Sequence, residues 1–317
     1  MSNPQFNFVK ATRAKAKASI QLEGLSGSGK SGLALILAYY LSGKSWDDVY
    51  AIDTENRSMP LYVGLTDPSG IKFGSFNILN LDKTVGFAPT TYLMAREAAI
   101  QAGAKAVISD SISHAWSYEG GVLDKVNQAK ATSTRYQKDS YAAWSDPEVM
   151  KEKNELLQLV RDSRAHIITT TRVKEKMEYA KDESGKTVLE SLGEQQIMQS
   201  EMKYEPDLVL HVLEPADPDK GTYTKVQVRK SRYAIFKKNE EYEMTPNLLE
   251  QLVRYLDEGV DPEEILEQQR QEYIEAITTH LDANPNKVAI WKVMKQDAGF
   301  GETNLKEVPL SGLKQLY

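Results

Sequence analysis

The sequence contains no cysteine, which excludes a disulfide framework and a cysteine-ligated zinc cluster. No apolar run approaches the roughly 20 residues that a membrane-spanning helix needs. The first residues are polar and basic, without the apolar stretch of a secretory signal. We therefore expect a cytoplasmic protein without membrane attachment.

Histidine is also scarce, and its four positions lack the spacing of metal ligands. These positions are His114, His166, His211 and His280. We expect all four to be ordinary structural residues.

Acidic residues exceed basic ones overall, but the excess lies in one part of the chain. The net charge is -6. Residues 246–317 hold 13 acidic and 7 basic residues, whereas the rest of the chain holds 32 of each. The same region has apolar residues at helical spacing, and Asp261 with Pro262 is typical of a helix start. With 317 residues the chain can bury one large core and a small appendage. We predict a main domain of residues 1–245 and a small helical domain of residues 246–317.

Short apolar strands alternate with helical patterns in the main domain, which predicts an α/β fold with a mainly parallel sheet. We expect an antiparallel extension after residue 206, and loops at the polar stretches 127–140 and 175–199. The predicted strands cover residues 19–23, 49–53, 106–108, 166–170, 207–213 and 223–228, and the predicted helices cover about 33–43, 91–103 and 147–164.

A glycine-rich segment after the first strand matches the phosphate-loop pattern G-x-x-x-x-G-K-[ST] completely. Its glycines let backbone N–H groups converge on phosphate oxygens, and the following helix adds a partial positive charge. We expect Lys30 to hold the β- and γ-phosphates of ATP and Ser31 to ligate Mg²⁺. The expected nucleotide-binding residues are Gly24, Ser26, Gly27, Ser28, Gly29, Lys30, Ser31 and Gly32.

Carboxylates follow two further strands. Asp110 ends the apolar strand in AVISDS, and we expect it to orient Mg²⁺ together with Ser31. Asp53 and Glu55 follow the second strand in YAIDTEN, at the sheet edge where ligands of α/β proteins bind. We choose Glu55 as the group that polarises the attacking water, with Asp53 as the alternative.

These three motifs, in this order, resemble the RecA-like recombinase ATPases. The resemblance implies that Glu55 activates water. It extends to VQVRKSRYAIF at residues 226–236, where Lys230 and Arg232 match two cations that reach a neighbouring subunit's γ-phosphate in that family. The resemblance therefore implies a homo-oligomer with nucleotide at its subunit interfaces.

The layout of residues 18–244, including HIITTTRVKEKMEY, is also similar to phage-encoded RecA-like ATPases associated with single-strand annealing and recombination. This similarity implies a phage-infected bacterial host and a possible annealing-protein partner. One departure is that the family carries a γ-phosphate-sensing glutamine after the fourth strand. This chain has Thr169, Thr170 and Thr171 instead, and we assign the sensing position to Thr170.

Two polar segments could contact single-stranded DNA. Residues 127–144 interleave cations with tyrosine and tryptophan, a mixture that suits phosphates and stacked bases. The same rings could instead pack beneath the segment, and the second segment could be a solvated hairpin. The candidate contacts are Lys130, Arg135, Lys138, Arg172, Lys174 and Lys176.

The first hypothesis is a Mg²⁺-dependent ATPase of RecA-like fold that oligomerises and acts on single-stranded DNA in phage-type recombination, annealing or repair. The alternative is a nucleotide-dependent switch that acts on a protein partner without DNA contact, which the neutral main domain favours. A third possibility is a small-molecule kinase, because many kinases share the phosphate loop.

Overall fold

The structure is a computed structural model that describes residues 11–162, 164–181 and 187–317, without the side chains of residues 175–195. The chain divides into two compact units. The larger is Ala16–Leu256, and the smaller combines Asp257–Tyr317 with the N-terminal residues up to Lys15.

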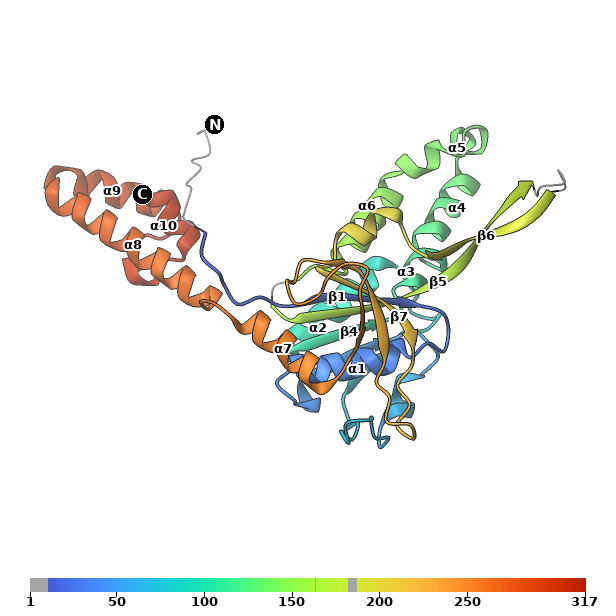
Figure 1. Cartoon of the computed structure of the whole chain (residues 1–317). Coiled ribbons are helices and arrows are strands. Elements are labelled where there is room, and N and C mark those ends of the chain that lie inside the picture. Colours follow the sequence, from blue (N-terminus) through green and yellow to red (C-terminus); the bar gives the residue numbers. More distant parts are fainter. Residues whose placement is uncertain (1–10, 163, 182–186) are drawn as a thin grey trace. The chain divides into compact units, whose positions relative to one another are not determined.

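A mixed sheet forms the centre of the larger unit (Figure 1). Its order is β3-β2-β4-β5-β1-β7-β8-β9, with β6 paired to β5. The pairs from β3 to β7 are parallel, whereas β8 and β9 add an antiparallel extension. The mainly parallel α/β fold with an antiparallel extension is thus confirmed. The strands are β1 Ser19–Gly24, β2 Val49–Asp53, β3 Asn77–Asn80, β4 Ala106–Asp110, β5 His166–Lys181, β6 Thr187–Gln196, β7 Leu208–Glu214, β8 Lys225–Ser231 and β9 Glu241–Glu243.

Helices cover both faces of this sheet because its central strands are apolar on both sides. On β4, Ile108 packs in the same core as Leu35, while the adjacent Val107 packs in the opposite core with Tyr92. Successive strand residues point to opposite faces, so one short strand serves both cores. The helices are α1 Lys30–Leu41, α2 Pro89–Gln101, α3 Ser113–Ser117, α4 Val122–Thr132, α5 Thr134–Lys138, α6 Pro147–Gln158 and α7 Pro246–Asp257.

Helix α7 belongs to the larger unit, although the sequence-based division lay between residues 245 and 246. Leu249, Leu252 and Leu256 form a stripe at helical spacing and are buried in the core that contains α1. Each fully buried leucine stabilises the packing by about 2 kcal/mol. The units therefore divide after α7 rather than before it.

The smaller unit contains α8 Pro262–Ala283, α9 Val288–Asp297 and α10 Leu310–Leu316. Asp261 caps α8, where its side chain accepts a hydrogen bond from the Glu263 amide at 3.0 Å. The unit has its own core, which contains Ile274, Ile277, Val308, Leu313 and Leu316. No helix in the described parts of the chain is long and apolar enough to cross a membrane.

Both polar stretches that we expected to be loops contain regular structure, so that prediction is wrong. Residues 127–140 lie mostly in α4 and α5, which are anchored because Val126 packs with Ala143 and Val149. Residues 175–199 lie largely in the β5–β6 hairpin, whose strands satisfy each other's backbone groups across an antiparallel ladder. Polar composition favoured loops in both places, although the sequence had also left a hairpin open for the second stretch.

Candidate functional site

The strand register brings the predicted residues to one edge of the sheet. Asp53 lies level with Asp110 across the β2–β4 pair, and Leu22, two residues before Gly24, lies level with Thr170 across the β1–β5 pair. The phosphate loop, the carboxylates and the threonine therefore meet at the carboxyl ends of parallel strands. Ligands of open α/β sheets bind at this edge.

The loop between β1 and α1 needs glycine at two tightly packed positions. Gly29 has φ 92°, and a Cβ there would lie 2.9 Å from Pro215. A Cβ at Gly24 would lie 2.7 Å from the Ser28 hydroxyl. That hydroxyl is buried and has no hydrogen-bond partner within the described residues. The loop is thus tightly packed at Gly24 and Gly29, and the Ser28 hydroxyl within it is available to hydrogen-bond a ligand.

Lys30 begins α1 and turns back over the loop, while Ser26 and Gly27 are exposed at its tip. The Lys30 ammonium donates hydrogen bonds to the carbonyls of Gly24, at 3.0 Å, and Leu25, at 2.6 Å. The ammonium is therefore held over the phosphate loop by its backbone carbonyls.

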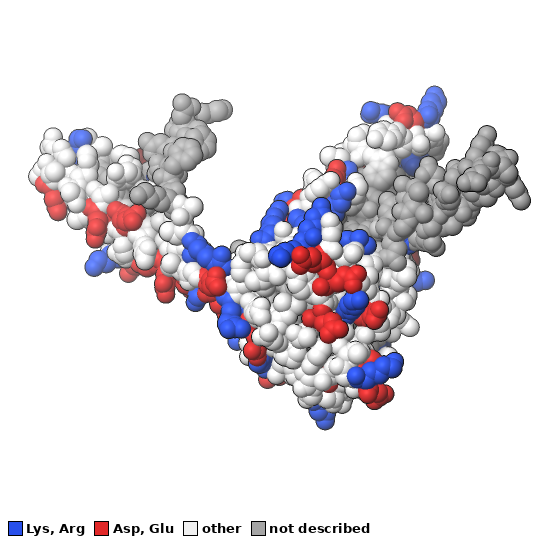
Figure 2. Space-filling view, viewed as in Figure 1, with Lys and Arg blue, Asp and Glu red and all other residues white. Residues whose placement is uncertain are grey.

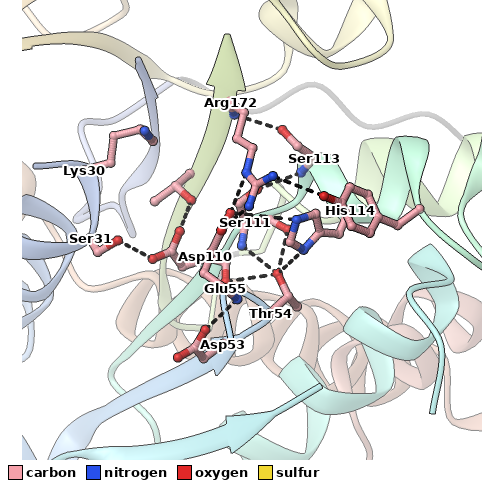
Figure 3. Close-up of polar contacts among 12 residues, drawn as sticks. Lys30, Ser31, Asp53, Thr54, Glu55, Asp110, Ser111, Ser113, His114 and Arg172 are labelled. Atoms are coloured by element: carbon pink, nitrogen blue, oxygen red, sulfur yellow. Dashed lines mark hydrogen bonds and ion pairs between the residues drawn. The ribbon is translucent and has the colours of Figure 1, made fainter. Parts of the chain in front are cut away.

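Ser31 and Thr170 both bind the carboxylate of Asp110 (Figure 3). The Ser31 hydroxyl donates to Oδ2 at 2.5 Å, and the Thr170 hydroxyl donates to Oδ1. Burial raises the pKa of Asp110 above its ordinary value, although both hydroxyls oppose that shift. The predicted magnesium pair is thus in direct contact.

These residues fit ATP and Mg²⁺. Ser31 and Asp110 offer oxygen ligands, which Mg²⁺ prefers, and Mg²⁺ commonly binds one or two carboxylates together with phosphate oxygens. The glycine cradle and the unpartnered Ser28 hydroxyl leave polar groups available to an anion.

Glu55 and Asp53 take different positions after β2. The Asp53 carboxylate accepts hydrogen bonds from the amides of Glu55, at 2.7 Å, and Met59, at 3.2 Å, and so shapes the turn. Burial raises its pKa. The Glu55 side chain is 22% exposed and points away from this turn, toward Arg172. Asp53 therefore supports the backbone, whereas Glu55 faces the site.

Arg172 binds Glu55 at two points. Its Nε donates to Oε1 at 2.8 Å, and its Nη2 donates to Oε2. Burial by itself would raise the pKa of Glu55, but Arg172, together with His114 and Ser111, holds it below its ordinary value. Arg172 also donates to the Tyr118 hydroxyl at 3.2 Å. Arg172, which we expected to contact DNA, is thus bound to Glu55, the residue expected to accept a proton from water.

His114, which we expected to be an ordinary structural residue, lies beside Glu55. The ring is buried, with Nδ1 2.8 Å from the Thr54 hydroxyl and Nε2 3.9 Å from Oε1 of Glu55. Burial lowers its pKa. The available signal was its position four residues after Asp110, in the short helix α3 at the end of β4.

A pocket of about 200 Å³ lies beside the phosphate loop. Gly29 and Gly32 form one side, and Tyr62, Phe73 and Pro215 contribute flat apolar surfaces. A Cβ at Gly32 would approach the Tyr62 ring to 3.0 Å. Glycine at this position therefore brings the ring close to the first turn of α1.

Lys230 and Arg232 lie at the opposite end of the sheet from the phosphate loop. They lie at the end of β8 that pairs with the start of β7, which itself pairs with the start of β1. Arg232 forms an ion pair with Asp207 at 2.7 Å, and Lys230 donates to the carbonyls of Tyr204 and Pro206. These cations are thus not part of the site in their own chain.

The other candidate DNA contacts lie on three elements, α4, α5 and β5. Lys130 is in α4, and Arg135 and Lys138 are in α5, where Figure 2 shows cationic and acidic side chains together at the tip. Lys174 is exposed on β5. Lys176 also falls in β5, but its side chain is outside the described residues.

Comparison with known protein families finds a match. The sequence profile of a family described as an AAA domain matches residues 16–243, which is more than half of the chain. No curated protein matches. AAA domains generally bind ATP and Mg²⁺, and the match covers every residue of the phosphate loop and the carboxylate pair. The chain belongs to the AAA domain family, which implies a nucleotide-dependent ATPase.

Proposed function

We propose that the chain is a Mg²⁺-dependent ATPase of RecA-like fold, with a small helical domain at its C-terminal end, that assembles into homo-oligomers. Its proposed substrate besides ATP is single-stranded DNA, in phage-type recombination, annealing or repair, with a single-strand annealing protein as a possible partner. The observation that carries the ATPase proposal is the hydrogen bond between Ser31 and Asp110, 79 residues apart in sequence. It joins the phosphate loop to the carboxylate expected to orient the metal.

Each residue has a distinct role in the proposed reaction. Lys30 binds the β- and γ-phosphates, and bound Mg²⁺ would neutralise phosphate charge between Ser31 and Asp110. Glu55 accepts a proton from the attacking water, whose oxygen bonds to the γ-phosphorus as ADP leaves with the bridging oxygen. Thr170, bonded to Asp110, is suited to respond to the γ-phosphate.

The pocket beside the loop supports a site for the nucleobase. Its aromatic and proline surfaces can stack on a base, and Gly29 connects it directly to the phosphate cradle. The sequence contains no Asn-Lys-x-Asp motif for guanine, which favours ATP over GTP.

The positions of Lys230 and Arg232 support action on a neighbouring subunit. Because they lie at the far end of the strands from Gly24, they cannot act on the nucleotide of their own chain, and any role in hydrolysis would be at another subunit's site. Adding excess Arg232→Ala subunits to wild-type protein should lower hydrolysis per wild-type subunit. An unchanged rate for Lys230→Ala, Arg232→Ala and the mixtures would contradict this part of the proposal.

The test of DNA action is ATP hydrolysis in Mg²⁺ with and without single-stranded DNA, repeated at rising salt. We expect DNA to stimulate hydrolysis less as salt rises. Log affinity falls linearly with log salt, and each neutralised phosphate of a single strand makes that fall steeper by about 0.7. Replacing Lys130, Arg135 and Lys138 by glutamine should reduce that slope. Replacing the exposed Lys83, Lys220 and Lys237 is the control.

This part of the proposal would be contradicted if DNA left the rate of hydrolysis unchanged and the protein did not bind DNA at low salt. The chain would then be a nucleotide-dependent switch for a protein partner, which the equal number of acidic and basic residues in residues 1–245 would favour.

A further inference from the structure

The His114 ring presents one nitrogen to Glu55 without a hydrogen bond. Its side chain is almost fully buried, and its Nε2 has no hydrogen-bond partner among the described residues. The nearest carboxylate oxygen is Oε1 of Glu55, 3.9 Å away. A buried polar atom without a hydrogen-bond partner destabilises the folded state. The position of Nε2 opposite Glu55 therefore calls for an explanation.

The proton on this ring is assigned from the carboxylate that faces Nε2. Thr54 Oγ1 accepts a hydrogen bond from the Ser111 amide at 2.9 Å and lies 2.8 Å from Nδ1, but it can also donate its proton to the carbonyls of Asp110, at 3.1 Å, and Ser111, at 3.2 Å, so this contact fits either tautomer of the ring. A bare lone pair on Nε2 would face the Glu55 carboxylate and be repelled by it. We therefore assign the proton to Nε2, which makes His114 a hydrogen-bond donor toward Glu55.

Aromatic packing fixes the ring on its other sides. The Tyr118 ring lies 4.0 Å from the His114 ring between centroids, and Phe87 contacts it edge-on at 5.4 Å. The Thr54 hydroxyl holds the remaining nitrogen. The ring cannot follow Glu55, so any new contact requires the carboxylate to move toward the ring.

The present distance is about 1 Å longer than a normal N–H···O hydrogen bond. Arg172 accounts for this gap, because its guanidinium engages both oxygens of Glu55. A carboxylate released by Arg172 would have two buried donors beside it, the Ser111 hydroxyl and the Nε2–H of His114.

We propose that His114 is a positioning residue for Glu55: when Arg172 releases the carboxylate, Nε2–H binds one oxygen and leaves the other aimed at the attacking water. This inference rests on the proposed ATPase activity with Glu55 as the base. His114 itself touches neither nucleotide nor water.

The test compares His114→Asn with His114→Gln in the full-length protein. Asparagine can place its amide near Nδ1 and keep the Thr54 contact, but it has no group at the position of Nε2. Glutamine can place an N–H donor at that position. We expect His114→Asn to lower kcat on the order of 10-fold to 100-fold with unchanged ATP affinity, because small misplacements of catalytic groups have effects of this size. His114→Gln should recover most of the loss.

A second measurement separates positioning from folding. In a Glu55→Gln background, His114→Asn should have no further effect on the residual rate, because there is no carboxylate to position. A wild-type kcat for His114→Asn, or an equal loss in both backgrounds, would overturn the inference while the ATPase proposal stands. Absence of hydrolysis by the wild-type protein would instead overturn the proposed function, and this inference with it.

Discussion

Arg172 and Glu55 form a two-point ion pair between the start of the β5–β6 hairpin and the turn after β2, with Nε 2.8 Å from Oε1. Both oxygens of the expected base are therefore engaged. A carboxylate in this arrangement is a poor proton acceptor, because the guanidinium stabilises its charged form.

Releasing this pair should activate the enzyme. We expect Arg172→Gln to raise ATP hydrolysis without DNA several-fold, since Glu55 is then free to accept a proton. The pKa of Glu55 should rise without the cation, so the acid limb of the pH profile of kcat/KM should move to higher pH. The matched control is Lys174→Gln, an exposed cation on the same strand. A rate at or below that of the wild type would contradict an inhibitory role for Arg172.

Asp110→Asn should separate stability from activity. Asp110 is buried, and burial raises its pKa, so removing its charge relieves a desolvation penalty. We expect an unchanged or higher thermal unfolding midpoint, while Mg²⁺-dependent hydrolysis falls by about 100-fold or more. Calorimetry and a phosphate-release assay measure the two quantities. Full activity in this variant would show that Asp110 does not orient the metal.

Two glycines of the loop give a matched pair of variants. Gly29→Ala places a Cβ 2.9 Å from Pro215 at φ 92°, whereas Gly27→Ala adds a Cβ in open space at φ 81°. The left-handed conformation costs either alanine about 1–2 kcal/mol. Only Gly29→Ala must also displace its neighbour, so we expect it to lose far more ATP affinity in a titration. Equal losses would mean that contact with Pro215 does not shape the cradle.

His166 predicts a dependence of stability on pH. Its Nδ1 accepts a hydrogen bond from the Ala18 amide at 2.9 Å, and burial lowers its pKa to about 3. In the unfolded chain a histidine has a pKa of about 6.5, so between these values the unfolded state binds more protons. The free energy of unfolding should therefore fall by up to about 1.4 kcal/mol per pH unit from pH 6.5 downward.

Chemical denaturation across this range measures that slope. His166→Asn keeps an acceptor for Ala18 without the titration and should flatten the curve, while the exposed His280→Asn should not. An unchanged slope in His166→Asn would assign the effect to other groups.

The sequence predicted the parts of the fold that local pattern controls. The strand at residues 49–53 has those bounds, and the loop, Ser31 and Asp110 meet as expected, because a strand, a glycine loop and a helix constrain one another locally. Composition was a poor guide to the β5–β6 hairpin, since a polar strand that projects from a sheet lacks the apolar alternation of a half-buried one.

The contacts around Glu55 could not be predicted in the same way. Glu55 and Arg172 are 117 residues apart, and His114 lies 60 residues from Thr54. Their meeting depends on which strands are neighbours and in which register, and on side-chain directions within α3. None of these is encoded in a short segment, so His114 resembled an ordinary buried histidine.

The most direct test of the central claim is Mg²⁺-dependent ATP hydrolysis by Glu55→Gln beside the wild-type protein, with ATP affinity measured on both. The account predicts that the wild type hydrolyses ATP. It also predicts that Glu55→Gln binds ATP equally well but hydrolyses it at least about 100-fold more slowly. Turnover at the wild-type rate by Glu55→Gln would contradict the assignment of the base and the roles of Arg172 and His114 built on it.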